Sequence, residues 1–254
     1  MNRLLAGIST AAASAALIAA APLAATADTT TAAPAPTTCD DTTPSIPREN
    51  AATQVAVGTT KVKTLELAIT TLAACEVTKV TAVVQAPRRT TTVTLRKVDT
   101  DSGVDYWRAG LRIDPATLRN SDAGVWPTRY TATGAAEDDA VVLDNQVLRA
   151  SRISFNAGPE PVRHGRLTYA GRVERASWNT DRYVVDPDRR VEVGYQPDPH
   201  EGGDVVARLR TGTDGRYRAS TAYPGPGSYD AEVLATPTTA GAHSRHDEVT
   251  TKLR

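Results

Sequence analysis

The sequence predicts an all-β protein built from two consecutive β-sandwiches of about 100 residues each. Three observations support this. Thr and Val are abundant, which favours strands over helices. Apolar residues alternate with polar ones over short stretches that end in Pro, Gly, Asp or Asn turns. No stretch after residue 28 sustains the 3.6-residue apolar period of a helix. A length of 254 residues allows one or two domains.

The N-terminus has the three parts of a secretory signal peptide, which we place at residues 1–27. A basic start, Met1–Arg3, precedes an apolar run, Leu4–Ala21, and the small residues Ala25–Ala27 fit a cleavage site before Asp28. A permanent membrane anchor is the alternative, but the run is mostly weakly apolar alanine diluted by Gly, Ser and Thr. We therefore expect a secreted, extracellular protein that is free of the membrane after cleavage.

Residues 28–48 are rich in Thr, Ala and Pro and are expected to form a flexible segment. This segment contains Cys39, and Cys75 is the only other cysteine. Two cysteines of an exported chain usually pair, so we predict a disulfide that ties this segment to the first sandwich. The alternatives are an intermolecular bridge or a catalytic thiol, but a nucleophilic cysteine needs a histidine and none precedes His164.

The alternating apolar pattern places strands throughout both halves of the chain. In the first half we expect strands at 53–57, 64–69, 77–84, 91–98, 106–113 and 126–133. In the second half we expect them at 166–173, 190–195, 205–210, 216–222 and 229–235. Residues 113–118 have room for one helical turn at most.

A weak internal repeat indicates that the two halves are copies of one module. Five segments of the first half recur in the same order in the second half, and the offset between the first pair of segments is about 111 residues. The pairs are 80–87 with 191–197, 93–96 with 206–210, 100–103 with 213–215, 106–109 with 217–219 and 124–126 with 227–229. The modules are then 49–150 and 151–254, with a boundary near 148–154, and each has the size of an immunoglobulin-like sandwich.

Two segments of the second module resemble a known group of proteins. Residues 153–167 (ISFNAGPEPVRHGRL) and 176–183 (ASWNTDRY) are similar to secreted actinobacterial proteins with tandem immunoglobulin-like modules, mostly of unestablished function. The resemblance covers about residues 50–254 and is strongest over 150–220, whereas Pro224–Gly227 departs from the pattern. It implies an exported tandem β-sandwich and supplies no catalytic residues.

Charge and histidine content argue against two function classes. Acidic and basic residues number 29 each, and neither half has a basic surplus, so we expect no nucleic-acid partner. No nucleophile-elbow motif accompanies the four histidines, which indicates that the protein is not an enzyme. These histidines are His164, His200, His243 and His246.

Metal binding is not expected, and neither is a cofactor. His243 and His246 precede two carboxylates, but outside a helix this spacing does not bring ligands together. The segment Asp99–Gly103 resembles the start of a calcium loop without its distal Glu. Acidic residues near the predicted boundary leave calcium at the junction open, although solvated turns are favoured. They are Glu137, Asp138, Asp139, Asp144 and Glu160.

Exposed aromatic rings are the remaining candidates for a binding surface. Trp178 and Tyr183 belong to a polar segment, and alternation along the strand requires Trp107 or its neighbour Tyr106 to face outward. Trp107, Trp178 and Tyr183 are therefore the candidate ligand contacts, while most other rings should be buried. We expect a monomeric, non-catalytic binding or spacer protein whose partner is a protein or glycan of the cell envelope. The alternatives are a carbohydrate-binding accessory protein and a small secreted hydrolase.

Overall fold

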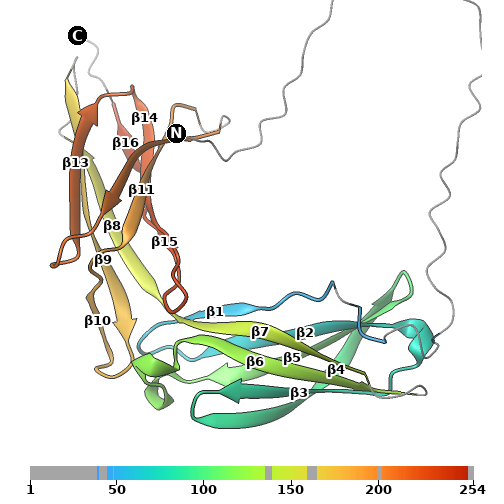
Figure 1. Cartoon of the computed structure of the whole chain (residues 1–254). Helices are drawn as coiled ribbons and strands as arrows, with labels where there is room; N and C mark the ends of the chain where they lie inside the picture. Colours follow the sequence, from blue (N-terminus) through green and yellow to red (C-terminus); the bar gives the residue numbers. More distant parts are fainter. Residues whose placement is uncertain are drawn as a thin grey trace, which may run out of the picture. The chain divides into compact units, whose positions relative to one another are not determined.

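The computed structural model describes Cys39 and residues 45–47, 49–134, 139–158, 165–198 and 202–250 (Figure 1). The predicted signal peptide, His164 and His200 lie outside these residues. Helix in the described part of the chain is limited to three short 3₁₀ turns, η1 (Ala73–Cys75), η2 (Pro115–Thr117) and η3 (Asn120–Asp122). None of the described helices is long and apolar enough to cross a membrane.

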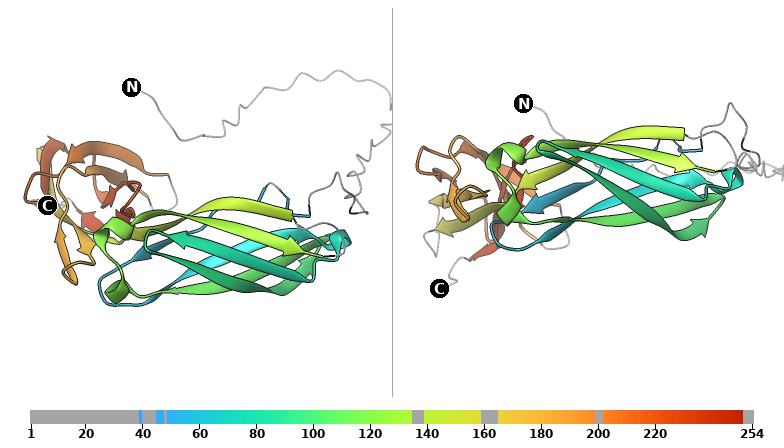
Figure 2. Two further views of the ribbon diagram at one scale, coloured as in Figure 1. Left: turned by 60° about the horizontal axis from the view of Figure 1, so that its bottom comes forward. Right: turned by 90° about the horizontal axis from the view of Figure 1, so that it is seen from below.

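The first sandwich contains seven strands (Figures 1 and 2). They are β1 (Gln54–Val57), β2 (Lys63–Leu72), β3 (Lys79–Ala86), β4 (Arg89–Asp101), β5 (Val104–Ile113), β6 (Gly124–Thr133) and β7 (Asp139–Arg149). One layer has the order β1-β7-β6-β3-β4 and the other has β4-β5-β2. Strand β4 belongs to both, because residues up to Leu95 pair with β3 and residues from Arg96 pair with β5.

Alternating side chains of the facing layers form the first core. On β2 the residues Leu65, Leu67 and Ile69 are buried, and between them lie polar or half-buried positions. On β6 the large rings of Trp126 and Tyr130 are buried as well. Each buried aliphatic side chain contributes roughly 1.5–3 kcal/mol of stability, so the burial of these side chains is the main interaction that holds the layers together.

A buried amide fixes the short edge strand β1 against β7. Asn145 on β7 donates from Nδ2 to Thr128 Oγ1 (3.0 Å) and to the Tyr130 hydroxyl (3.1 Å). Its Oδ1 accepts a hydrogen bond from the amide of Thr53 (2.8 Å), directly before β1. Because each of these atoms is satisfied, Asn145 can occupy an inward position at little cost. Strand β1 then pairs in parallel with β7, Gln54 opposite Gln146.

The second sandwich has two smaller layers. One contains β8 (Ser151–Gly158), β9 (Arg166–Ser177), β10 (Arg182–Val185) and β13 (Arg216–Ala222). The other contains β11 (Arg190–Gln196), β12 (Asp204–Arg210), β14 (Gly227–Val233), β15 (Ala242–His243) and β16 (Asp247–Val249). The core between the layers includes Tyr169 on β9, Val193 on β11 and Tyr229 on β14. The rings of Tyr169 and Tyr229 pack with centroids 5.9 Å apart.

The strand order confirms the predicted all-β, immunoglobulin-like fold. The segments matched in the sequence repeat lie on corresponding strands: β3 with β11, β4 with β12, β5 with β13, and β6 with β14. Strand β3 lies between β6 and β4, and the corresponding strand β11 lies between β14 and β12. Strands β7, β8, β10, β15 and β16 were not among the strands expected from the sequence.

Gly171 on β9 allows two segments to approach closely. A Cβ at this position would lie 2.0 Å from the Ser154 carbonyl oxygen and 2.4 Å from the Tyr217 hydroxyl oxygen. That hydroxyl donates to the same carbonyl (2.7 Å), so the side chain of Tyr217 closes over Gly171.

We predict that Gly171→Ala lowers the free energy of unfolding by about 3 kcal/mol, because it adds an overpacked methyl group and disturbs this hydrogen bond. Urea unfolding measures the change. Gly202→Ala is the matched control, since a Cβ there would meet nothing within 4 Å. Equal loss of stability in the two variants would contradict this account.

Candidate functional site

The connection between the two sandwiches is a single residue. Strand β7 ends at Arg149 and β8 begins at Ser151, so only Ala150 lies between them. The Ala150 amide donates to the Val57 carbonyl of β1 (2.9 Å), and the Ala150 carbonyl accepts from the Ala176 amide of β9 (2.9 Å). Both sandwiches belong to one compact unit, Ala35–Arg254. The connecting residue is therefore bonded to both sandwiches rather than being a free linker.

Trp178, at the end of β9, is a core residue of the first sandwich. Its side chain is 3% exposed and packs with the first core cluster, together with Ala176. The indole Nε1 donates to the Gly58 carbonyl (3.0 Å) and lies 3.3 Å from the Val57 carbonyl oxygen. The expectation that this ring is exposed is wrong, because the first sandwich covers it.

The polar residues around Trp178 bond to the η3 turn of the first sandwich. Asn120 accepts the Trp178 amide at Oδ1 (2.8 Å) and donates from Nδ2 to Ser177 Oγ (3.2 Å). In return, Asn179 Oδ1 accepts the Asn120 amide (2.9 Å). The polarity of this segment therefore reflects a hydrogen-bonded contact between the sandwiches and not a solvated loop.

A third contact at the junction involves the turn after β14. Arg149 accepts the Ala240 amide at its carbonyl (2.9 Å) and donates its own amide to the Thr238 carbonyl (3.1 Å). Ser151 Oγ donates to the Ala240 carbonyl (2.6 Å). Residues on both sides of Ala150 are thus held by the same turn.

A buried carboxylate lies close to this junction. Asp186 is fully buried and accepts hydrogen bonds from Arg175 and from Arg189, the latter also buried. Burial lowers the pKa of Arg149, the positive charge of Arg175 lowers it further, and Asp186 acts in the opposite direction. Arg175 Nε has no hydrogen-bond partner in the described part of the chain. Positive charge therefore exceeds negative charge in this region.

The other two candidate ligand contacts are also covered. Trp107 is 5% exposed and donates from Nε1 to Thr71 Oγ1 (2.9 Å), so it is a core residue of the first sandwich. Its neighbour Tyr106 is half-buried. Tyr183 is half-buried, and the guanidinium of Arg152 lies 3.5 Å from its ring centroid. A stacking platform needs an open ring face, but both tryptophans are buried and Arg152 lies over the ring of Tyr183.

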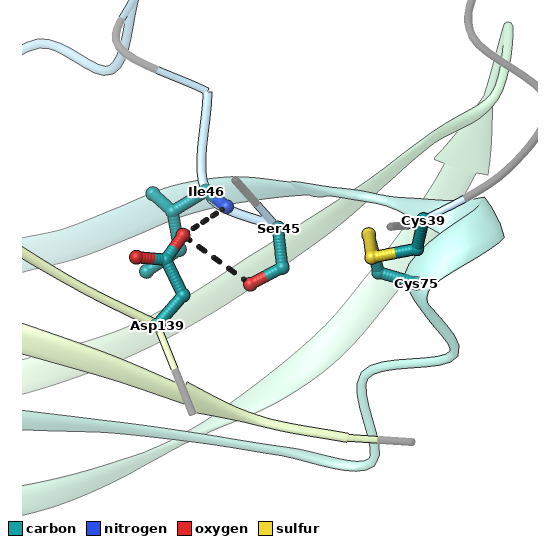
Figure 3. The surroundings of a disulfide bond; sticks show 5 residues. All are labelled: Cys39, Ser45, Ile46, Cys75 and Asp139. Atoms are coloured by element: carbon teal, nitrogen blue, oxygen red, sulfur yellow. Dashed lines mark hydrogen bonds between the residues drawn. A yellow bond between two sulfur atoms is a disulfide. The ribbon is translucent and has the colours of Figure 1, made fainter. Parts of the chain in front are cut away.

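The predicted disulfide joins Cys39 to Cys75 in the η1 turn (Figure 3). Close to it, the carboxylate of Asp139 accepts hydrogen bonds from the Ile46 amide (2.9 Å) and from Ser45 Oγ (3.4 Å). The segment before β1 is therefore attached to the first sandwich both by the disulfide and by hydrogen bonds.

The residues considered for metal or catalytic chemistry are dispersed. Within the described ranges, no group of three His, Cys, Asp or Glu side chains could hold a metal ion. His243 Nε2 lies 3.4 Å from Glu232 Oε1, and His246 Nδ1 lies 3.2 Å from Ser228 Oγ. Among the described residues no carboxylate bonds to His246, so the third member of a catalytic triad is absent there. Glu137, Asp138 and Glu160 lie outside the described residues.

A small hollow of about 140 Å³ lies beside the η3 turn and is lined by Arg88, Asp122 and Trp126, among others. Asp122 is 3% exposed and accepts from Arg88 Nε (3.0 Å) and from the Arg119 amide (2.7 Å). Its carbonyl accepts the indole N–H of Trp126 (2.8 Å). Burial alone would raise the pKa of Asp122, but the hydrogen bonds and charges of Arg88 and Arg119 hold that pKa below its usual value.

Comparison with protein family models finds no match, and neither does comparison with curated proteins. Solved structures of similar fold include the titin I-band fragment I67–I69 (11% identity, TM-score 0.30), which covers 79% of this chain and 62% of that chain. They also include the N-terminal eight Ig domains of DSCAM (12% identity, TM-score 0.32, covering 80% of this chain and 23% of that chain). The D00–D0 domain of intimin is a third example (12% identity, TM-score 0.27, covering 81% and 98%). At these scores the fold assignment rests on the strand order described above.

We predict that replacing both Cys39 and Cys75 with Ser lowers the free energy of unfolding by up to about 4 kcal/mol. The bridge closes a sequence separation of 36 residues, and without it the unfolded chain gains conformational entropy. Denaturant unfolding measures the difference. A reducing agent should destabilise the wild type to the same extent and leave the double variant unchanged. Two free thiols in the non-reduced protein, detected by mass spectrometry, would contradict the pairing.

We also predict a pH-dependent loss of stability for Asp122→Asn. The pKa of Asp122 is lower in the folded than in the unfolded chain, so its charged form stabilises the fold above about pH 4, and this contribution disappears as the pH falls toward the folded pKa. The variant should lose roughly 2 kcal/mol at pH 7 and approach the wild type in acid. Asp204→Asn, at an exposed position, is the control for unfolding curves measured across this range. A deficit that stays constant down to pH 2 would show that the charge of Asp122 is not the cause.

Proposed function

We propose that this chain is exported and acts outside the cell as a non-catalytic binding or spacer protein. Its two immunoglobulin-like sandwiches would work as one coupled unit. The observation that carries this proposal is the insertion of Trp178, from the second sandwich, into the core of the first.

The chemistry of the junction supports a coupled unit. Modules joined by a polar, flexible linker move independently of each other, and their interfaces are usually small. Here the link is Ala150 alone, and it is hydrogen-bonded to Val57 on one side and Ala176 on the other. Asn120 adds side-chain hydrogen bonds across the same contact. Such a protein can transmit force or hold two surfaces in register.

Export is supported by the disulfide and by the N-terminal sequence. Disulfides persist in oxidising compartments, and the Cys39–Cys75 bridge stabilises a segment that has little of its own to bury. The predicted signal peptide leads to the same compartment. We place the partner, a protein or a glycan, in the cell envelope.

The two alternative functions have less support. A carbohydrate-binding accessory protein would present open aromatic rings, but Trp107 and Trp178 are buried and Tyr183 carries Arg152 on its ring. A hydrolase would need a base held by a third group, and within the described residues the contact between His246 and Ser228 has none. Binding through exposed sheet faces and loops remains the function that the geometry favours.

Coupling of the sandwiches can be tested by scanning calorimetry. We expect the wild type to unfold in one transition and Trp178→Ala to unfold in two, because the variant loses a buried side chain worth about 3–5 kcal/mol at the contact itself. Trp107→Ala is the matched control, since it removes a buried tryptophan within the first sandwich and should lower the melting temperature without uncoupling the second.

If Trp178→Ala does not fold, Asn120→Ala tests the same contact more mildly, because it removes hydrogen bonds without leaving a large cavity. Two separate transitions in the wild type would contradict the coupled unit. Retention on isolated cell envelope tests the binding role. A chain starting at Asp28 that is retained neither by wall polymers nor by envelope proteins would contradict that part of the proposal.

A further inference from the structure

The exposed face of the β11–β12–β14 layer is hollowed around two arginines. Two neighbouring hollows of about 380 and 310 Å³ share Arg190, Arg210 and Leu234 in their walls. We call this combined surface the arginine groove and define it by Asp188, Arg190, Glu192, Arg208, Arg210 and Leu234. Hollows of this size are typical of sites for small molecules.

The charges of the groove do not balance. Arg208 Nε pairs with Glu192 Oε1 (2.9 Å), and Arg210 pairs with Asp188 Oδ1 (2.6 Å). The third arginine, Arg190, is exposed and forms no ion pair or side-chain hydrogen bond with any other described residue. One guanidinium in the middle of the groove is therefore left without a counter-charge.

The pairing register of β11 and β12 strengthens this surplus of positive charge. Glu192 on β11 lies directly opposite Arg208 on β12, which is a favourable cross-strand pair. Arg190 lies directly opposite Arg210, and like charges in that position destabilise a sheet. An oxyanion placed between the two guanidinium groups would remove this repulsion and accept hydrogen bonds from both.

The buried carboxylate that bonds to Arg189 is already shared between two arginines and leaves Arg190 uncompensated. Arg189, which lines the smaller hollow, is buried and bonds to Asp186 and to the Leu234 carbonyl. Asp186 is shared with Arg175, so one carboxylate serves two arginines. Asp186 is therefore not a counter-charge for Arg190.

One wall of the groove is apolar. Leu234, Ala235 and Pro237 line the smaller hollow next to Arg190 and Arg210. A bare ion would leave this wall exposed to water, whereas a ligand with both an anionic group and a carbon skeleton would cover it. Sugar acids and phosphorylated sugars have this combination, because their ring C–H groups form an apolar face beside the charge.

We infer that the arginine groove binds an anionic sugar, a carboxylated or phosphorylated monosaccharide unit of an acidic glycan. The oxyanion lies between Arg190 and Arg210, and the sugar ring lies against Leu234 and Pro237. This inference rests on the proposed function only in placing such a glycan in the cell envelope, and the binding itself can be measured with purified compounds.

Titration calorimetry on the chain from Asp28 onward tests the site with four probes: glucuronic acid, glucose 6-phosphate, glucose and inorganic phosphate. We expect the two anionic sugars to bind, with affinity falling as salt rises, and glucose not to bind. The two anionic sugars distinguish a carboxylate preference from a phosphate preference. Equal binding of glucose, or inorganic phosphate binding as tightly as glucose 6-phosphate, would overturn the inference.

Arg190→Gln should weaken binding of the anionic sugars by about tenfold or more, because it removes the uncompensated guanidinium. The matched control is Arg218→Gln, an exposed arginine on β13 in the other layer, which should bind as the wild type does. Leu234→Ala should weaken binding of the sugars and leave inorganic phosphate unaffected. Unchanged binding by Arg190→Gln would overturn the inference.

The same Arg190→Gln variant separates this inference from the proposed function. If the wild type is retained on cell envelope and Arg190→Gln is equally retained and binds the anionic sugars as tightly as the wild type, the inference fails, while the proposed function stands. If the anionic sugars bind in the groove but the wild type is not retained on envelope, the binding site stands and the envelope location fails.

Discussion

The burial of Trp178 in the first sandwich is the interaction on which the rest of the architecture depends. The residue directly follows β9 of the second sandwich, yet its indole N–H donates to the Gly58 carbonyl and its ring joins the first core. An aromatic side chain buries roughly 150–250 Å² of surface, and Tyr183 packs against the same core beside Trp178. Separating the two sandwiches would therefore expose apolar surface, and this couples two ordinary modules into one unit.

The sequence predicted best those strands whose inward side chains are uniformly apolar. On β2, for example, Leu65, Leu67 and Ile69 alternate with outward residues, and the expected strand coincides with the observed one to within a few residues. Strand β7 was missed because the polar Asn145 occupies an inward position and interrupts the pattern. Its partners, Thr53 and Tyr130, are distant in sequence, so the hydrogen bonds that make this position acceptable are visible only in the folded chain.

The same limitation explains why the expected exposure of Trp178 is wrong while the predicted disulfide is confirmed. With only two cysteines and an N-terminus that predicts export, the pairing of Cys39 with Cys75 needs no knowledge of the fold. The exposure of Trp178 was inferred from its polar neighbours, but Asn179 is bonded to Asn120 of the other sandwich. A hydrogen-bonded polar residue at an interface and a solvated one in a loop have the same local sequence, so only the long-range contact distinguishes them.

Net charge has a similar weakness as a guide to binding. The chain is neutral as a whole, and each half is balanced, which argues against a nucleic-acid partner. Balance over a hundred residues does not require balance over one sheet face, however, and the register of β11 and β12 places Arg190 opposite Arg210. Trp178 is buried at the junction and cannot serve as a stacking platform for a ligand. A ligand would therefore have to bind an exposed surface. The arginine groove is such a surface and contains the unpaired charge of Arg190. The core and junction residues of such a sandwich are needed for stability, whereas its outer residues can vary without loss of the fold. Specificity for a ligand is therefore expected to reside in the outer residues.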